Sequence, residues 1–163
     1  MITKAVVVHS SIDASWSLFP EFMGRVKSFC STYDSDINLP ILEEFLKMSF
    51  VSKKPSALMI LGLDEQGTPL AHMLAIAEAW FGYPVVTVVQ LEADKRIPQE
   101  LWYEAEAAID TFAQAHNANI VQIAARNQSV ARLFRMKGGF KENRIIMRRP
   151  VNGRAVSDPS KVG

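Results

Sequence analysis

Residues 85 to 89 read Val-Val-Thr-Val-Val, a run of five β-branched side chains. Such residues favour strands, and a strand that is apolar on both faces must be covered on both faces. We therefore predict a fully buried central strand here. The rest of the chain has to supply the neighbouring strands and the covering helices.

Apolar residues at intervals of three and four predict helices on either side of this strand. Residues 15 to 30 carry the first such stripe, which is expected to bury Trp16, Phe19, Met23, Val26, Phe29 and Cys30. A second helix is expected to begin near Pro40 and to bury Ile41, Leu42, Phe45, Leu46 and Met48. A third is expected from Pro98 to near Asn117, and a short fourth from Ser129 to Lys137.

Further strands are expected near residues 5–8, at 57–63 before the turn Asp64 to Gly67, at 120–124 and at 144–148. Leu70 to Trp80 stays open, because its Ala, Leu and Met content favours a helix whereas its alternation favours a strand. Strands interleaved with helices indicate an α/β fold with a mixed sheet covered on both faces. We expect a single domain over residues 1–149 and a basic C-terminal tail over 150–163.

The chain length and the cysteine usage restrict the class of protein further. A chain of 163 residues is the usual size of one domain, and its single cysteine, Cys30, can form neither an intramolecular disulfide nor a thiolate metal cluster. A cytoplasmic environment is the natural interpretation. His72, Glu78 and the break at 82–84 interrupt the longest apolar region, so we expect no membrane span.

Charge is unevenly distributed along the chain. Residues 1–125 contain 8 Lys or Arg and 15 Asp or Glu, whereas residues 126–163 contain 10 and 2. A basic segment attracts phosphates or an acidic protein surface, so it suggests a protein partner or self-association. The two parts could equally neutralise each other within the fold. Nucleic-acid binding is disfavoured, because no aromatic residues are interleaved with the basic ones.

Residues 127–140, Asn-Gln-Ser-Val-Ala-Arg-Leu-Phe-Arg-Met-Lys-Gly-Gly-Phe, resemble the last motif of the GNAT superfamily of N-acetyltransferases. In that motif an Asn opens a short helix and a Gly-Phe pair starts the last strand. The resemblance extends over residues 57–149, and small GNAT-like proteins of bacteriophages are similar in size. It implies a mixed, mostly antiparallel central sheet flanked by helices on both faces.

The resemblance also implies acetyl-CoA as cofactor, with the pantetheine arm along the strand at 85–93. The residues expected to bind it are Leu91, Ala93, Lys95, Arg96 and Asn127. The next loop, residues 94–100, departs from the glycine-rich pyrophosphate loop of the superfamily: it has no glycine, contains Pro98 and carries carboxylates at both ends. Lys95 and Arg96 would have to replace the backbone amides in binding the phosphates.

The catalytic positions are altered as well. Many GNAT enzymes use a tyrosine on the last helix as general acid, and Phe134 stands at the matching position. Ser129 is the nearest hydroxyl in sequence, although a serine at a helix start is often a cap. Glu92 and His72 are the candidate general bases, with Glu78 as a further carboxylate. No spacing of His9 or His116 suggests a metal site.

Two functions therefore remain open at this stage. The first is an acyl-CoA-dependent N-acyltransferase acting on a small-molecule or protein amine. The second is a GNAT-fold protein without catalysis that serves as a structural or binding component, for example of a phage particle or its assembly in the host cytoplasm. The first function would be favoured if a cleft were lined by Arg126, Arg132 and Arg135. The second would be favoured if an outer patch were formed by Arg148, Arg149, Arg154 and Lys161.

Overall fold

The computed structural model describes residues 1–125, 128–137 and 139–141. Its elements in chain order are β1 (Lys4–Val7), α1 (Ser15–Tyr33), α2 (Leu39–Val51), β2 (Ala57–Leu63), β3 (Pro69–Trp80), β4 (Tyr83–Ala93), α3 (Gln99–Ala115), β5 (Val121–Ile123) and α4 (Gln128–Lys137). The segment from 70 to 80 is therefore a strand. The expected strand at 144–148 and the expected tail at 150–163 lie outside the described residues.

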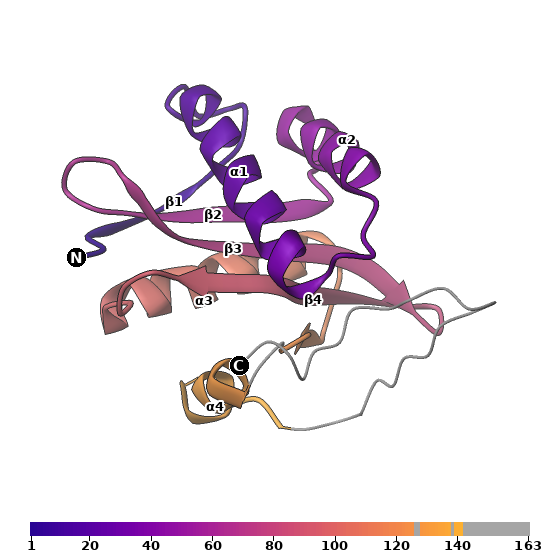
Figure 1. The fold of residues 1–163 in the computed structure, drawn as a ribbon. Helices are drawn as coiled ribbons and strands as arrows, with labels where there is room; N and C mark the ends of the chain where they lie inside the picture. The colour runs from indigo at the N-terminus through magenta and orange to yellow at the C-terminus, as the bar shows by residue number, and fades with distance from the viewer. Residues whose placement is uncertain (126–127, 138, 142–163) are drawn as a thin grey trace.

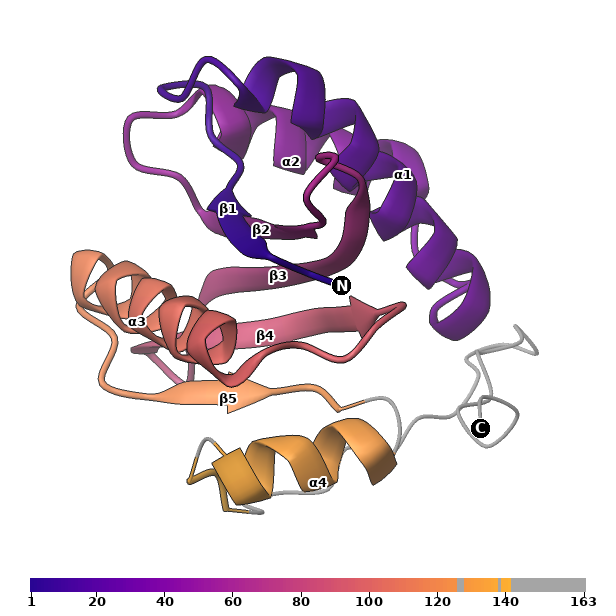
Figure 2. The ribbon, with the colours of Figure 1, turned by 90° about the vertical axis from the view of Figure 1, so that its left-hand side faces the viewer.

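The strands form one mixed sheet in the order β1-β2-β3-β4-β5 (Figure 1). Neighbours are antiparallel from β1 to β4, and β5 lies parallel to β4. Helices α1 and α2 cover one face, while α3 and α4 lie on the other (Figure 2). The predicted fold class, a mostly antiparallel sheet with helices on both faces, is confirmed.

The two larger hydrophobic cores lie on opposite faces of this sheet. Phe22, Val26 and Leu46 of α1 and α2 pack against β2 and β3 on one face. Trp102, Ile109 and Phe112 of α3, with Phe134 of α4, pack on the other. Val85, Val86, Thr87 and Val88 of β4 lie between the two cores and are at most 6% exposed. Four of the five β-branched residues are thus buried as the sequence predicts, whereas Val89 is only partly buried.

Three side chains that the helical stripes predict to be buried are exposed. Trp16 is 58% exposed, Ile41 67% and Met48 65%. Trp16 lies in the first turn of α1, where one ring edge meets Phe50 and its indole N–H donates to the Ser10 carbonyl. Ile41 and Met48 are seven residues apart and share the outer side of α2, because Leu46 and Phe50 turn inward. Apolar spacing alone did not distinguish the two sides of this helix.

A two-residue turn joins β3 to β4 and fixes their register. Trp80 pairs with Tyr83, and between them Phe81 and Gly82 have φ values of 48° and 85°. Positive φ at both positions is the requirement of the hairpin turn that matches strand twist. The hairpin thus forms despite the helix-favouring composition of β3.

No helix in the described part of the chain is long and apolar enough to cross a membrane.

Candidate functional site

Strand β4 extends beyond its partner β5, and this difference in length opens the sheet. Pairing with β5 covers Val86 to Val88, and one further backbone bond joins the Ala124 N–H to the Val88 carbonyl at 3.0 Å. Opposite β3, the register shifts between Leu74 and Ala75, which pair with Gln90 and Val88 and leave Val89 as a bulge. From Val89 onward, no backbone hydrogen bond in the described residues joins β4 to the chain after Ala124. Within the described residues, the β5-facing edge of β4 beyond Val88 therefore has no backbone partner.

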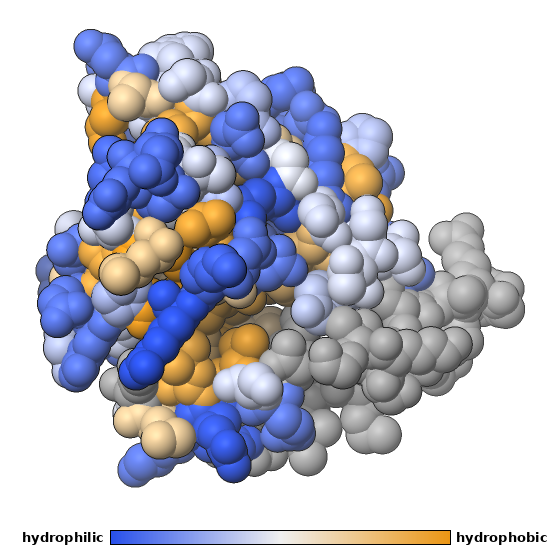
Figure 3. Space-filling view, turned by 60° about the vertical axis from the view of Figure 1, so that its left-hand side comes forward, coloured by the Kyte–Doolittle hydropathy of each residue, from blue (hydrophilic) through white to orange (hydrophobic). Residues whose placement is uncertain are grey.

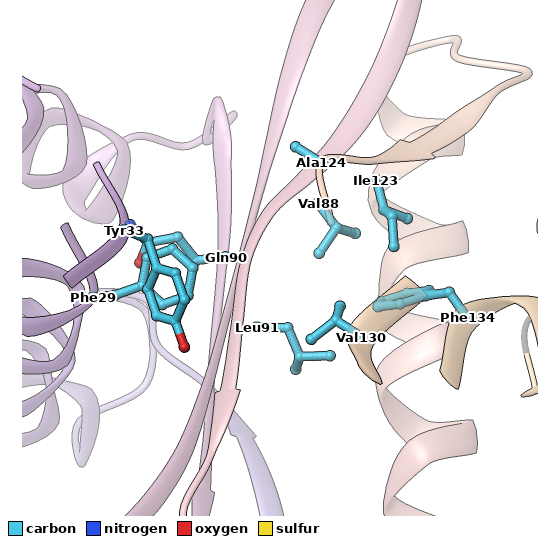
Figure 4. Close-up of a pocket in the computed structure, with 9 residues that line it drawn as sticks. All are labelled: Phe29, Tyr33, Val88, Gln90, Leu91, Ile123, Ala124, Val130 and Phe134. Carbon is cyan, nitrogen blue, oxygen red and sulfur yellow. The ribbon is translucent and has the colours of Figure 1, made fainter. Parts of the chain in front are cut away.

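A pocket lies at the point where the two strands separate (Figure 4). Phe29 and Tyr33 of α1 lie with Gln90 on one side of β4, and α4 contributes Val130 and Phe134 on the other. The remaining lining residues are Val88, Leu91, Ile123 and Ala124. At the level of β5, just above α4, Figure 3 shows an apolar hollow in the surface. An elongated ligand with an apolar end suits this opening.

The pocket contains one hydroxyl, and α1 supplies it. Phe134 is 2% exposed and packs edge-on against Trp102 and Phe140, so no group that can donate a proton stands at that position. Tyr33 is half-buried and packs against Phe29 as a tilted ring pair, with 4.5 Å between ring centroids. Among the residues that line this pocket, only Tyr33 could supply a proton through a hydroxyl.

A buried polar network lies beneath α1, next to the pocket. His72 is 1% exposed, and its Nε2 lies 3.0 Å from Oε1 of Gln90. The Gln90 amide donates to Sγ of Cys30 at 3.3 Å, and Nε of Arg25 donates to Nδ1 of His72 at 3.4 Å. Phe22 and Phe29 meet the imidazole edge-on. The contacts are compatible with a neutral imidazole that carries its proton on Nε2.

The pKa of His72 agrees with this assignment. It is lowered from 6.5 to about 4, mainly by burial and to a lesser degree by the Arg25 charge, while the Gln90 hydrogen bond and Asp94 oppose the shift. His72 is therefore neutral at pH 7. Because both ring nitrogens are engaged and the ring is buried, His72 is placed to hold Arg25 and Gln90 in position.

Arg25 links α1 to the end of β4. Its guanidinium donates to both carboxylate oxygens of Asp94, at 3.0 and 3.2 Å, and to the Pro69 carbonyl at 3.4 Å. Glu92 lies 3.5 Å from the same guanidinium. The Arg25 hydrogen bond is the main reason why the pKa of Asp94 is lowered. Glu92, a predicted catalytic residue, thus belongs to an ion-pair cluster that fastens the strand end.

A second polar cluster is centred on Glu78, on the sheet face that α1 and α2 cover. Its Oε1 accepts hydrogen bonds from the Thr87 hydroxyl at 2.7 Å, the Trp80 indole at 2.7 Å and the Gln122 amide at 3.3 Å. Thr87 and Gln122 are partners across β4 and β5, one pair before the last. Glu78 itself is exposed. A fixed carboxylate therefore stands one strand position before the opening.

The other predicted site residues that the structure describes lie on β4, in the loop after it and on α4. Leu91 lines the pocket, Ala93 is exposed at the end of β4, and Lys95 and Arg96 are exposed in the next loop. Ser129 is exposed in the first turn of α4, and Asn127 lies outside the described residues. Arg132 and Arg135 are exposed and do not line the pocket, and Arg126 is not described.

Several residues of the site were not selected by sequence reasoning: Arg25, Tyr33, Thr87, Gln90 and Gln122. Gln90 has the clearest signal in the sequence, because it is a polar residue directly after the apolar run of β4. Arg25 and Tyr33 have no such signal in the sequence, since their roles depend on how α1 crosses the sheet.

The described residues contain no group of three or more His, Cys, Asp or Glu side chains that could hold a metal ion.

Comparison with solved structures identifies the fold. The chain is similar to glucosamine-6-phosphate N-acetyltransferase from Arabidopsis thaliana, with 12% identity, a TM-score of 0.59 and coverage of 92% of this chain and 100% of that one. It is also similar to an aminoglycoside acetyltransferase from an uncultured soil metagenomic sample, with 11% identity, a TM-score of 0.59 and coverage of 91% of this chain and 96% of that one. A Trypanosoma brucei acetyltransferase is similar as well, with 12% identity, a TM-score of 0.58 and coverage of 91% of this chain and 99% of that one. No protein-family model and no curated protein sequence matches the chain.

These likenesses cover nearly the whole length of the chain. At 11–12% identity they establish the fold, which is that of the GNAT acetyltransferases. Function has to be inferred from the site itself.

Proposed function

We propose that this chain is an N-acyltransferase that transfers an acyl group from a thioester to an amine. The observation that carries the proposal is the opening between β4 and β5, where a free strand edge, a bulge at Val89 and an apolar pocket coincide. A free strand edge offers amides and carbonyls to an extended ligand. A pantetheine arm has the amide groups to use it.

Acetyl-CoA is the donor that the fold suggests. The β4 edge from Leu91 to Ala93 fits the pantetheine arm, and the apolar lining of the pocket fits a small acyl group. Such a thioester supplies an activated acyl carbon. Asn127, Lys95 and Arg96 remain predicted cofactor contacts. Holding the donor in a fixed orientation beside an amine accounts for much of the rate that such a site can provide.

Glu78 is the residue that we propose as general base. An ammonium acceptor must lose a proton before its nitrogen can attack the acyl carbon, and a carboxylate can accept that proton directly or through one water. Three donors fix Oε1 of Glu78, and the described residues place no hydrogen-bond partner on Oε2. The same carboxylate would attract a cationic acceptor. The predicted bases His72 and Glu92 are both engaged with Arg25 instead.

Tyr33 is the residue that we propose as general acid. When the amide bond forms, the carbon–sulfur bond breaks and the leaving thiolate needs a proton. Tyr33 contributes the hydroxyl of the pocket, whereas the predicted alternative, Ser129, is exposed on α4. In this scheme a hydroxyl from α1 replaces the missing tyrosine of the last helix.

The test is calorimetric titration of the full chain with acetyl-CoA, using Ala124→Phe to fill the pocket. We expect the affinity to fall by at least about tenfold in this variant, because the added ring occupies the space of the acyl group. Ala107→Phe, on the exposed side of α3, is the matched control and should bind normally. Equal binding by both variants would contradict the proposal.

One observation favours a second function. Phe134 removes the usual proton donor while the fold is preserved, as in a protein that has kept the GNAT scaffold for a structural or binding role. A phage particle or assembly component would be an example, with the basic C-terminal segment as its contact to a partner. Absence of binding by any acyl thioester at millimolar concentration would favour this alternative.

A further inference from the structure

The loop between β4 and α3 has little to offer a pyrophosphate. In this fold the loop lies at the end of the strand edge along which we place the donor. Its first residue, Asp94, is bound through both carboxylate oxygens to Arg25, and Glu92 lies beside the same guanidinium. Arg25, which is bound at the strand end, is thus already neutralised by two carboxylates.

The start of α3 is equally unsuited to an anion. Anions bind at helix starts through free backbone N–H groups and the positive end of the helix dipole. Pro98 precedes the helix and has no N–H, and Glu100 places a carboxylate in the first turn. The sequence from 94 to 98 contains no glycine, so every position carries a side chain that keeps the backbone away from a ligand.

The positive charges of Lys95 and Arg96 only balance the negative charge that the carboxylates of this region leave. Both are exposed, and the Lys95 charge also contributes to the lowered pKa of Asp94. Exposed ion pairs contribute at most about 1 kcal/mol each. Arg25, Lys95 and Arg96 carry three positive charges and Glu92, Asp94 and Glu100 carry three negative ones, so these described residues have no net positive charge.

We propose that this chain recognises its donor through the acyl group and the pantetheine arm, with no net contribution from the pyrophosphate of a nucleotide. Its donor class is then pantetheine thioesters in general, including those without a nucleotide. The inference rests on the proposed acyltransferase function. It concerns only how the donor is selected.

The experiment compares acetyl-CoA with S-acetylpantetheine by calorimetry on the full chain, at low and moderate salt. We expect dissociation constants within about threefold of each other and a weak dependence on salt, since a pyrophosphate contact would add affinity that salt screens. Acetyl-CoA binding about thirtyfold tighter or more, with that advantage falling steeply with salt, would overturn the inference and leave the acyltransferase proposal intact. Failure of both compounds to bind would overturn both.

Variants of the loop sharpen the comparison. In the double variant Asp94→Asn, Glu100→Gln, acetyl-CoA should bind about three- to tenfold more tightly while S-acetylpantetheine is unchanged, because two repelling charges are removed. Asp110→Asn is the control, since ten residues of helix place it about 15 Å from Glu100, beyond effective screening distance. A loss of about tenfold or more in acetyl-CoA affinity alone in Lys95→Gln, Arg96→Gln would contradict the inference.

Discussion

Glu78 is the single side chain on which the proposed chemistry depends most. In Glu78→Gln the amide oxygen can still accept from Thr87 and Trp80, so the local structure should survive while the base is lost. We expect kcat/KM for an amine acceptor to fall by about 10²- to 10⁴-fold, with donor affinity unchanged. Steady-state kinetics over a range of pH measure this, and activity should partly recover at high pH, where the amine is already deprotonated. Glu65→Gln, in the exposed β2–β3 turn, serves as control.

Tyr33 is tested by removing one oxygen atom. Tyr33→Phe keeps the ring that packs against Phe29 but removes the hydroxyl from the pocket. We expect kcat to fall by about 10²-fold, with the acetyl-CoA dissociation constant changed less than about threefold. Tyr103→Phe on the exposed surface of α3 should have no effect. A Tyr33→Phe enzyme with full kcat would assign the proton donor to another group.

His72 makes stability depend on pH. Its pKa is about 4 in the folded chain and 6.5 in an unfolded one. As pH falls below 6.5, His72 is therefore protonated in the unfolded chain while it stays neutral in the folded chain. The stabilisation is complete above pH 6.5 and is lost progressively towards pH 4, by about 3 kcal/mol in all and about 2 kcal/mol by pH 5. Urea unfolding at pH 7, 6 and 5 measures how the free energy of unfolding changes with pH, in a range where most carboxylates stay ionised.

The matched variant for this prediction is His72→Gln. It loses packing against Phe22 and Phe29 and is expected to be less stable at every pH, but the slope between pH 7 and 5 should decrease. The diagnostic quantity is thus the pH dependence and not the stability at one pH. An unchanged slope in His72→Gln would show that another group causes it.

At the scale of the elements, the hairpin between β3 and β4 holds a strained residue. Phe81 has φ of 48° and is 90% exposed, so its ring gains little from burial while its backbone occupies a region that favours Gly, Asn and Asp. Phe81→Asn should stabilise the chain by up to about 1 kcal/mol, since Asn-Gly suits this turn. Thermal unfolding of Phe81→Asn and of the exposed control Tyr103→Asn measures the difference. Lower stability of Phe81→Asn would mean that the aromatic ring contributes to the fold.

The bounds of helices and strands are predicted best from the sequence where turn-forming residues mark their ends. The bounds of β2, Ala57–Leu63, agree with prediction to the residue, because Pro55 precedes the apolar run and Asp64 begins a turn in which its carboxylate accepts from Gln66 and Thr68. For β3 the propensity and the alternation disagreed, and pairing on both edges decided the outcome.

The site could be predicted only where one segment contains it. Leu91 and the loop after β4 were found because the resemblance marks a continuous stretch. Tyr33 and Gln90 belong to the pocket only because α1 crosses the sheet at β4, 57 positions away along the chain. Glu78 was recognised as a strand carboxylate, but its partners Thr87 and Gln122 come from two further strands.

At the scale of the whole molecule, the two cores are joined through one sheet and should unfold together. Leu74 of β3 faces the core of α1 and α2, whereas its neighbours Met73 and Ala75 face the core of α3 and α4. Neither helix layer can lose its packing without exposing apolar residues on the same strands. A chain of this size usually shows a single cooperative transition in that situation.

This coupling predicts that damage to either core lowers the same transition. Phe22→Ala and Phe112→Ala remove buried rings from opposite faces of the sheet, at 0% and 8% exposure, and each should cost about 3–5 kcal/mol. Urea unfolding followed by far-UV and near-UV circular dichroism should give coincident curves for both variants and for the unmodified chain. If one variant showed two separate transitions, the layer carrying the mutation would fold independently. The Arg25 cluster, which ties α1 to the loop that leads into α3, would then be too weak to couple the layers.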